Sequence, residues 1–264
     1  MHEDVTVVSG DEVFAAIEAM LPAPPHRPLL VAVDGADGAG KTTLADSLAT
    51  HLAGRGRRVV RASLDDFHHP QEFRHRFGRT GETVWARHFD YRAARRELLD
   101  PWLAGAGAAY RRRWHDVATD EYFGADCDPV PEAGVLLVDG LFAQRGELAN
   151  AWDLVVYVAL DDQTRISRMA VRDGSPDDLG HPDQRRYLDA QAIYRAACDP
   201  LTMADLVVDN SGPSPTLVAG EGSPGALQQW RREGDWLTRT LRLPVARADL
   251  AEAVDALVDP AAEG

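Results

Sequence analysis

Lysine is almost absent from this chain of 264 residues: of its 28 basic residues 27 are arginine, and Lys41 is the only lysine. Cysteine is also scarce, because Cys127 and Cys198 are the only two, and two thiols cannot build a disulfide framework. No apolar run approaches the roughly 20 residues that cross a bilayer, and the amino terminus is acidic where a secretory signal is basic. These absences predict a cytoplasmic protein with no membrane partner.

Acidic residues outnumber basic ones by 42 to 28, so the formal net charge is −14 at pH 7. That charge argues against nucleic acid as a partner. The basic residues are nevertheless concentrated, since 14 of them fall between Arg55 and Arg113 beside seven acids. A locally positive region inside an acidic chain fits a small anionic ligand, although solvated helix faces would give the same pattern.

Continuous apolar runs and helical periodicities alternate along the chain. The apolar runs predict buried strands at 29–34, 59–64, 135–138, 154–160 and 204–208. Helical spacing predicts helices at 13–21, 42–52, 93–103, 161–172 and 184–197. Strands separated by helices indicate an α/β fold, in which helices cover both faces of a parallel sheet.

Breaks in composition divide the chain into three parts. Residues 1–28 are predicted to hold an N-terminal helix and a proline-rich linker, and 29–211 the α/β domain. The segment 211–225 contains four glycines and three prolines, which predicts a flexible loop. The part 212–264 would then consist of this loop and two C-terminal helices, at 228–243 and 248–258. The sequence does not reveal the role of those helices, and it leaves homo-oligomerisation open.

A glycine-rich segment at 35–42 matches the phosphate-binding pattern G-x-x-x-x-G-K-[ST] in full. It follows a predicted buried strand and opens a predicted helix, so backbone N–H groups and the helix dipole converge on phosphate oxygens. Lys41 would reach the β- and γ-phosphates, and a planar guanidinium cannot replace its compact ammonium there. Thr42 would ligate Mg²⁺. The predicted cofactors are ATP and Mg²⁺, and the predicted nucleotide-binding residues are Gly35, Ala36, Asp37, Gly38, Ala39, Gly40, Lys41, Thr42 and Thr43.

Two carboxylates follow predicted strands that would neighbour this loop. Asp65 follows the second strand, where it could accept a proton from an attacking hydroxyl or help to hold Mg²⁺. Asp139 ends the apolar run 135–138, which is the Walker B arrangement that supports the metal. A GTPase is disfavoured, because its Asn-Lys-x-Asp motif cannot exist when the single lysine is already used. A kinase or a nucleotide-driven switch remains.

Further segments resemble the uridine kinase family, within the wider group that includes phosphoribulokinase. They are Leu-Asp-Asp-Phe-His at 64–68, His-Asp-Val-Ala-Thr-Asp at 115–120 and Cys-Asp-Pro at 198–200, and the resemblance runs over about 29–211. It implies a P-loop kinase with a small helical lid at about 165–185, which moves the γ-phosphoryl of ATP to the 5′-hydroxyl of uridine or cytidine. It also implies that Asp65 is the base, that Asp90 holds the ribose and that Asp139 assists Mg²⁺.

Arginines of the predicted helix 161–172 are spaced as one helical stripe, at Arg165, Arg168 and Arg172. Similar family members use arginines here and in the adjoining lid to clamp the transferring phosphoryl, which implies catalytic roles for Arg168 and Arg172, with Lys41 and Asp65. Charge gathers on that group in the transition state, so such contacts stabilise it. A solvated arginine face would give the same spacing.

The predicted acceptor pocket departs from the family pattern. Val117 stands where related kinases have the phenylalanine of a Tyr-Asp-Phe-x-x-His segment, and Asp120 replaces its histidine. The segment 174–178 is acidic where the lid would carry arginine. An anionic acceptor, another alcohol (pantothenate-like, sugar-phosphate or secondary-metabolite) and a non-catalytic ATP-binding regulatory module therefore stay open beside uridine or cytidine. The residues expected to contact the acceptor are Asp90, Tyr110, His115, Arg76, Arg79 and Arg87.

Overall fold

The computed structural model describes residues 10–22 and 27–219. The predicted C-terminal helices at 228–243 and 248–258 lie outside the described residues. Within the described part, none of the helices combines the length and the apolar character that a membrane span requires.

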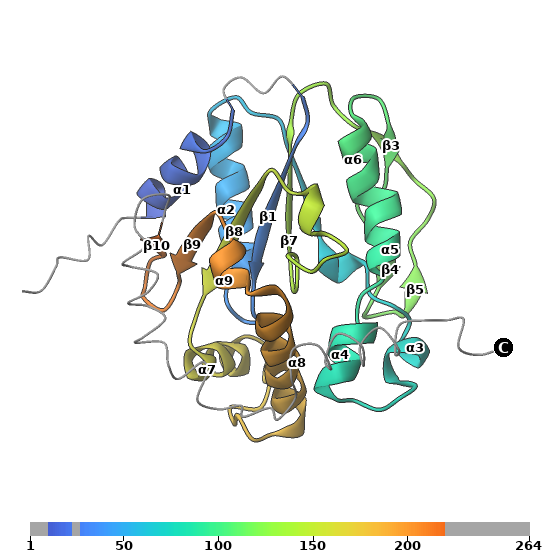
Figure 1. Ribbon diagram of the computed structural model, residues 1–264, viewed down its shortest axis with the longest axis vertical. Helices are drawn as coiled ribbons and strands as arrows, with labels where there is room; N and C mark the ends of the chain where they lie inside the picture. The colour runs from blue at the N-terminus through green and yellow to red at the C-terminus, as the bar shows by residue number, and fades with distance from the viewer. Residues whose placement is uncertain (1–9, 23–26, 220–264) are drawn as a thin grey trace, which may run out of the picture.

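A six-stranded sheet forms the centre of the fold, in the order β10-β9-β8-β1-β7-β2 (Figure 1). The five predicted strands are all present and pair in parallel, which confirms the α/β P-loop fold. β1 occupies the middle, because its apolar residues are buried on both faces. The strands are β1 (Leu29–Gly35), β2 (Val59–Ser63), β7 (Val135–Gly140), β8 (Leu154–Ala159), β9 (Leu206–Asp209) and β10 (Thr216–Ala219).

Alternate residues of β1 enter two different cores, one on each face of the sheet. Val31 and Val33 pack with α1 and α2. Leu30 and Ala32 pack on the other face, with helices that follow β2 and β8. The longer helices are α1 (Gly10–Ala19), α2 (Lys41–Gly54), α4 (Gly81–Arg87), α7 (Asp162–Asp173) and α8 (Pro182–Cys198).

Helix α8 packs closely against α4, at the end of the molecule toward which β1 runs (Figure 1). A Cβ atom at Gly81 would stand 2.5 Å from the Cβ of Asp189, so only glycine permits this approach. The shorter helical elements are η1 (Leu64–Asp66), α3 (Gln71–His75), α5 (Tyr91–Ala93), α6 (Asp100–Ala104), η3 (Ala149–Ala151) and α9 (Pro200–Met203). Two small hairpins pair β3 (Ala109–Tyr110) with β6 (Asp128–Pro129) and β4 (His115–Asp116) with β5 (Glu121–Tyr122).

The helix predicted at 93–103 is present but contains a turn of π-helix, η2 (Ala94–Leu99). Pro101 lies just beyond this turn and has no backbone N–H, so it cannot donate to the carbonyl of Glu97 four residues earlier. That carbonyl instead accepts a hydrogen bond from Arg111 N at 2.7 Å. The local widening thus ties the helix to the segment that leads into the small hairpins.

One prediction was wrong: the segment 211–225, expected to be a flexible loop, contains strand β10. Thr216 pairs with Asp209 in an antiparallel register, so the chain turns back on itself after β9. The run Thr-Leu-Val-Ala has high β-propensity, and pairing with the edge strand outweighs the glycines and prolines around it. The sheet is therefore mixed at this edge.

Candidate active site

The glycine-rich loop joins the end of β1 to the start of α2, as its sequence predicted. Gly38 and Gly40 have φ of +72° and +90°, a backbone region that side chains rarely adopt. A Cβ at Gly38 would lie 2.7 Å from Met169 Cγ, and one at Gly40 would lie 2.5 Å from Asn210 Nδ2. The loop is therefore enclosed by α7 on one side and by the segment after β9 on another.

Lys41 is folded into this loop. Its side chain is almost fully buried, and Nζ donates a hydrogen bond to the Ala36 carbonyl at 2.7 Å. Asn210 Nδ2 donates to the Ala39 carbonyl at 2.8 Å and so holds the loop from outside. These contacts fix the only lysine of the chain within the predicted phosphate cradle.

Thr42 and Asp139, predicted to hold Mg²⁺, are brought together by the fold. Thr42 Oγ1 donates to Asp139 Oδ2 at 2.6 Å, across the contact between α2 and β7. A hydroxyl beside a carboxylate is the oxygen donor set that P-loop proteins offer to Mg²⁺, so these residues fit the ion. In the described part of the chain no three His, Cys, Asp or Glu residues form a metal cluster. Nucleotide phosphates and water would have to supply the remaining ligands.

Arg61, which the sequence did not indicate, holds the other side of Asp139. Its guanidinium donates to Asp139 Oδ1 at 2.9 Å and to the Leu137 carbonyl at 2.8 Å, and it also pairs with Asp46 at 3.0 Å. Asp139 is 1% exposed, so this contact stabilises its charge where water cannot. No motif marks such a residue, because its role depends on the pairing of β2 with β7.

Asp65 lies at the same edge of the sheet as Asp139. The last residue of β2, Ser63, is opposite Asp139, and its hydroxyl donates to the Asp139 carbonyl at 3.2 Å. The same hydroxyl accepts from Asp65 N at 3.3 Å, and His68 Nδ1 donates to the Asp65 carbonyl at 2.6 Å. These backbone contacts fix the Asp65 position and leave its carboxylate exposed.

Asp90 follows α4 and lies beside the segment after β2, since Asp90 N donates to the Phe67 carbonyl at 2.7 Å. One carboxylate oxygen caps α5 by accepting from Ala93 N, and the other is 3.9 Å from His69 Nδ1. Burial lowers the pKa of the His69 ring, and the charge of Asp90 opposes that shift. Asp90 therefore lies near the candidate base but is partly committed to a structural contact.

The other predicted acceptor residues are placed unequally. His115 is fully buried, and its backbone forms a parallel β-bridge with Phe67, two residues after the candidate base. Both of its ring nitrogens lack a hydrogen bond, and Nε2 is 3.4 Å from Asp120 Oδ1. Arg87 and Arg76 lie on α4 and just after α3, and their guanidinium groups stack on the ring of Phe77 at 4.1 and 5.5 Å.

Tyr110 is not brought to this site. It is buried in strand β3, with its ring 5.5 Å from that of Trp102, near the end of α6 and far from α7 and α8 (Figure 1). The helix 91–104 carries the chain away from the carboxyl ends of the strands before Tyr110 is reached. Sequence proximity to the basic region misled the prediction, because Tyr110 serves the hydrophobic core.

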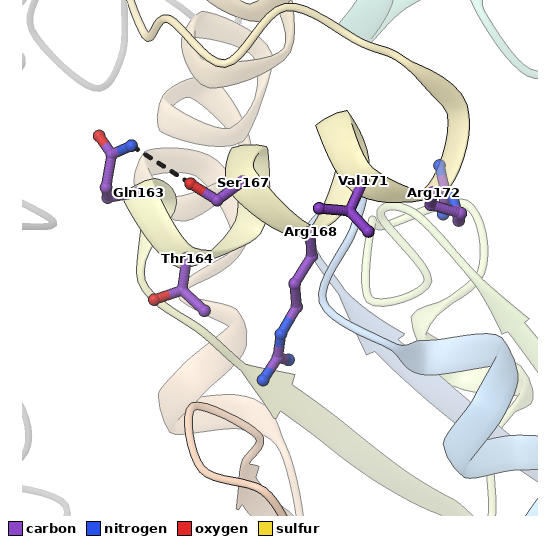
Figure 2. Close-up of a pocket in the computed structure, with 6 residues that line it drawn as sticks. All are labelled: Gln163, Thr164, Ser167, Arg168, Val171 and Arg172. Atoms are coloured by element: carbon purple, nitrogen blue, oxygen red, sulfur yellow. Dashed lines mark hydrogen bonds between the residues drawn. The ribbon is translucent and has the colours of Figure 1, made fainter.

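The three arginines of α7 point in different directions. Arg165 is completely buried and pairs with Asp37 of the P-loop at 2.7 Å and with Asp162 at 3.3 Å. Arg168 donates to the Asn210 carbonyl at 2.8 Å, whereas Arg172 is largely exposed and pairs with its neighbour Asp173. Figure 2 shows the last two leaving the helix on separate sides of an open pocket. The pocket is lined by Gln163, Thr164, Ser167, Arg168, Val171 and Arg172.

In this arrangement Arg165, and not Arg168 or Arg172, contacts the P-loop. The spacing puts the three arginines on one side of α7, but it also spreads them along the helix axis by about 1.5 Å per residue. Each arginine therefore has a different neighbour: Asp37, the Asn210 carbonyl and Asp173. Arg165 Nη2 and Asp37 Oδ1 are both buried without a hydrogen-bond partner. A buried polar atom without a hydrogen-bond partner destabilises the folded protein. These two atoms therefore indicate a position where a polar ligand could supply the missing hydrogen bonds.

A second feature that sequence reasoning missed is the buried carboxylate of Asp34, the last side chain before the loop. It accepts hydrogen bonds from the Tyr194 hydroxyl, from Gln144 Nε2 at 3.0 Å and from Gly35 N at 2.7 Å. Burial raises the pKa of Asp34, and the bonds from Tyr194 and Gln144 oppose that rise. This network joins the start of the P-loop to α8.

Comparison with known proteins gives a consistent picture of the fold. A protein-family model described as an AAA domain (AAA_18) matches residues 31–189. The signal recognition particle receptor FtsY of Mycobacterium tuberculosis is 27% identical over 258 residues, which are 96% of this chain and 50% of the relative. The chain thus spans about half the length of FtsY.

A thymidylate kinase of Xanthomonas campestris pv. campestris is 35% identical over 170 residues, covering 64% of this chain and 71% of the kinase. Among solved structures, one titled a possible uridine kinase from Bacillus stearothermophilus superimposes with a TM-score of 0.57 and 23% identity. That superposition covers 75% of this chain and 95% of the other. It shows a shared fold.

Proposed function

The chain belongs to the AAA domain family (AAA_18) and has the fold of a P-loop kinase, and from this premise we propose that it is an ATP- and Mg²⁺-dependent kinase acting on a hydroxyl of a small metabolite. The observation that carries the proposal is the contact between Thr42 and Asp139 at 2.6 Å, next to the buried Lys41 and at the sheet edge that bears Asp65. Nucleotide, metal and base functions then meet at one end of the sheet.

Each group has a defined task in this proposal. The loop amides and Lys41 bind the β- and γ-phosphates, and Thr42 and Asp139 hold Mg²⁺, which would neutralise phosphate charge when bound. Asp65 orients the acceptor hydroxyl and receives its proton. The acceptor oxygen forms a bond to the γ-phosphorus while the bond from that phosphorus to the bridging oxygen breaks, and ADP leaves. The positioning of the two reactants supplies most of the rate enhancement.

Among the arginines of α7, Arg165 is the best placed to contact the transferring phosphoryl, because it already touches the P-loop. Arg168 and Arg172 are proposed to approach when the lid closes over the nucleotide, which requires α7 to change its contacts. Breaking the exposed pair of Arg172 with Asp173 costs little, since surface ion pairs contribute about 0–1 kcal/mol.

Uridine or cytidine is the first acceptor to test. The support is the resemblance of 64–68 and 198–200 to the uridine kinase family, together with Asp90 beside the candidate base. A different alcohol is the alternative, because the segment 115–120 lacks the phenylalanine that the family resemblance leads us to expect at Val117.

The experiment combines nucleotide binding with turnover. Calorimetry should detect binding of Mg·ATP to the wild-type chain and no binding to Lys41→Arg, which keeps the charge but not the slim shape. An ADP-release assay against a panel of nucleosides and other alcohols should then identify an acceptor. With that acceptor Asp65→Asn should reduce turnover by about 10² or more while ATP affinity stays unchanged.

Asp66→Asn is the matched control, because Asp66 is the next residue and pairs with Arg113 at 3.4 Å rather than with the proposed reactants. Equal activity of Asp65→Asn and wild type would remove Asp65 from the role of base. Tight nucleotide binding with no acceptor-dependent ADP release would instead favour the non-catalytic ATP-binding module.

A further inference from the structure

Two arginines from distant parts of the chain are linked through His69, His88 and Tyr187 on the acceptor side of the site. Arg74 belongs to α3, and its side chain is buried, with Nε donating to the His69 carbonyl at 2.8 Å. Arg186 belongs to the first turns of α8, and its guanidinium carbon lies 4.7 Å from the ring centre of Tyr187. The charge of Arg186 acts directly on Arg74 and contributes to lowering the pKa of Arg74, of which burial is the main cause.

Each of these two arginines has only a long ion pair with a carboxylate. Arg74 Nη2 is 4.0 Å from Asp120 Oδ1, an oxygen that already accepts from Gln71 N at 2.7 Å. Arg186 Nε is 3.9 Å from Asp183 Oδ1, which is held at 2.8 Å by Arg79. Arg186 Nε is also buried without any hydrogen-bond partner. A buried donor of this kind is costly unless a ligand satisfies it.

Neighbouring histidines respond to the same positive charge. Burial lowers the pKa of His88 and of His75, and in both cases Arg74 and Arg186 add to that effect. Neutral histidines beside two arginines leave the local field positive without adding further cations. An anion that entered this region would therefore meet two guanidinium groups whose existing ion pairs, at 4.0 and 3.9 Å, are long.

A series of contacts leads from Arg186 toward the candidate base. Tyr187, on which Arg186 stacks, lies within electrostatic range of Asp65 and of Asp37 in the P-loop. Its hydroxyl is 3.3 Å from His88 Nε2, and the His88 ring lies 5.1 Å from that of His68, which binds the Asp65 carbonyl. The side chains of Tyr187, His88 and His68 thus connect Arg186 with the backbone of the candidate base.

We propose that Arg74 and Arg186 form an oxyanion site, separate from the P-loop, that binds a phosphate monoester carried by the acceptor alcohol. The inference rests on the proposed kinase function and selects the anionic acceptor from its alternatives. Two forked guanidinium groups suit a phosphate dianion, because each can donate two parallel hydrogen bonds. The hydroxyl of the same molecule would then face Asp65.

The test uses inorganic phosphate as the probe and keeps the P-loop occupied. The full chain is first saturated with Mg²⁺ and the non-hydrolysable analogue AMP-PNP, and phosphate is then titrated by calorimetry. Wild type should bind phosphate, and Arg74→Gln and Arg186→Gln should each bind it at least tenfold more weakly. Arg185→Gln should bind like wild type, because Arg185 pairs with Asp189 at 2.9 Å. Arg186→Lys keeps a positive charge and should bind phosphate with an affinity between those of wild type and Arg186→Gln. This conservative variant keeps the test valid if Arg186→Gln fails to fold.

The outcomes separate the two proposals. Absence of heat with Mg·AMP-PNP would refute the kinase function, and the inference with it. Nucleotide binding followed by no phosphate binding, or phosphate binding that all the arginine variants share, would overturn the inference alone. Turnover of uridine with a KM unaffected by Arg186→Gln would also overturn it, since a neutral acceptor has no use for the pair. A phosphorylated alcohol whose KM rises in both variants, with kcat nearly kept, would support it.

Discussion

The ring of His88 should make this protein less stable as pH falls, and the substitution His88→Gln should remove that contribution. His88 is 4% exposed and packs edge-on against the rings of His68, Phe89 and Tyr187. Burial lowers its pKa from 6.5 to about 2, with further contributions from His68, Arg74, Arg186 and His75. The folded protein therefore keeps this ring neutral at pH values where the unfolded chain protonates it.

The size of the effect follows from proton linkage. Below the unfolded pKa of 6.5 the unfolded state holds one more proton at His88 than the folded state does. Stability is thus fully present above that pH and falls by about 1.4 kcal/mol for each unit of acidification below it. Between about pH 7.5 and about pH 5 the loss from this single group amounts to about 2 kcal/mol.

Urea unfolding at a series of pH values, for wild type and His88→Gln, measures this quantity. The difference in free energy of unfolding between the two proteins at pH 7.5 measures the packing that the substitution removes. The change in this difference between pH 7.5 and pH 5 measures the contribution of protonation at His88. Contributions of His68, His69 and His75, whose pKa values are also lowered, are common to both proteins and cancel. As pH falls, the free energy of unfolding of wild type should decrease toward that of the variant or below it. Curves of unfolding free energy against pH that stay parallel for the two proteins would refute the reasoning.

Two further substitutions test contacts described above. In urea without metal, Arg61→Ala should lower the free energy of unfolding by about 2 kcal/mol, because it leaves the buried Asp139 charge without its guanidinium partner. Addition of Mg·ATP should recover part of this loss. An equal loss with and without Mg·ATP would contradict the proposed role of Asp139. Thr80→Ala should lower the free energy of unfolding by about 1 kcal/mol in the same measurement, because the Thr80 hydroxyl accepts a hydrogen bond from Thr83 N in the capping box of α4. An unchanged free energy of unfolding would mean that α4 is held by packing against α8 alone.

Local signals in the sequence were enough for the sheet and for the glycine-rich loop between β1 and α2. The apolar runs placed the five parallel strands because both faces of the sheet are covered, and the loop with Lys41 and Thr42 is a contiguous motif. Asp139 could be found as well, since it ends a strand whose position beside the P-loop follows from the fold class.

The rest depends on contacts that no local pattern records. Arg61 reaches Asp139 only because β2 pairs with β7, and Asp34 meets Tyr194 across 160 residues of chain. Tyr110 was misplaced because the direction of the helix before it decides which end of the sheet it reaches. Arg165 was passed over for Arg168 and Arg172 because the rotation of α7 against the P-loop is set by tertiary packing.

The solitary lysine has a practical consequence for labelling. Amine-directed reagents find one side-chain target in the whole chain, and it is almost fully buried and bonded to the Ala36 carbonyl. Acylation at this position would report whether the cradle is open or filled, with no background from other side chains. The extent of Lys41 acylation, measured by mass spectrometry of one peptide, would thus report whether a ligand occupies the loop in crude mixtures, without any engineered tag.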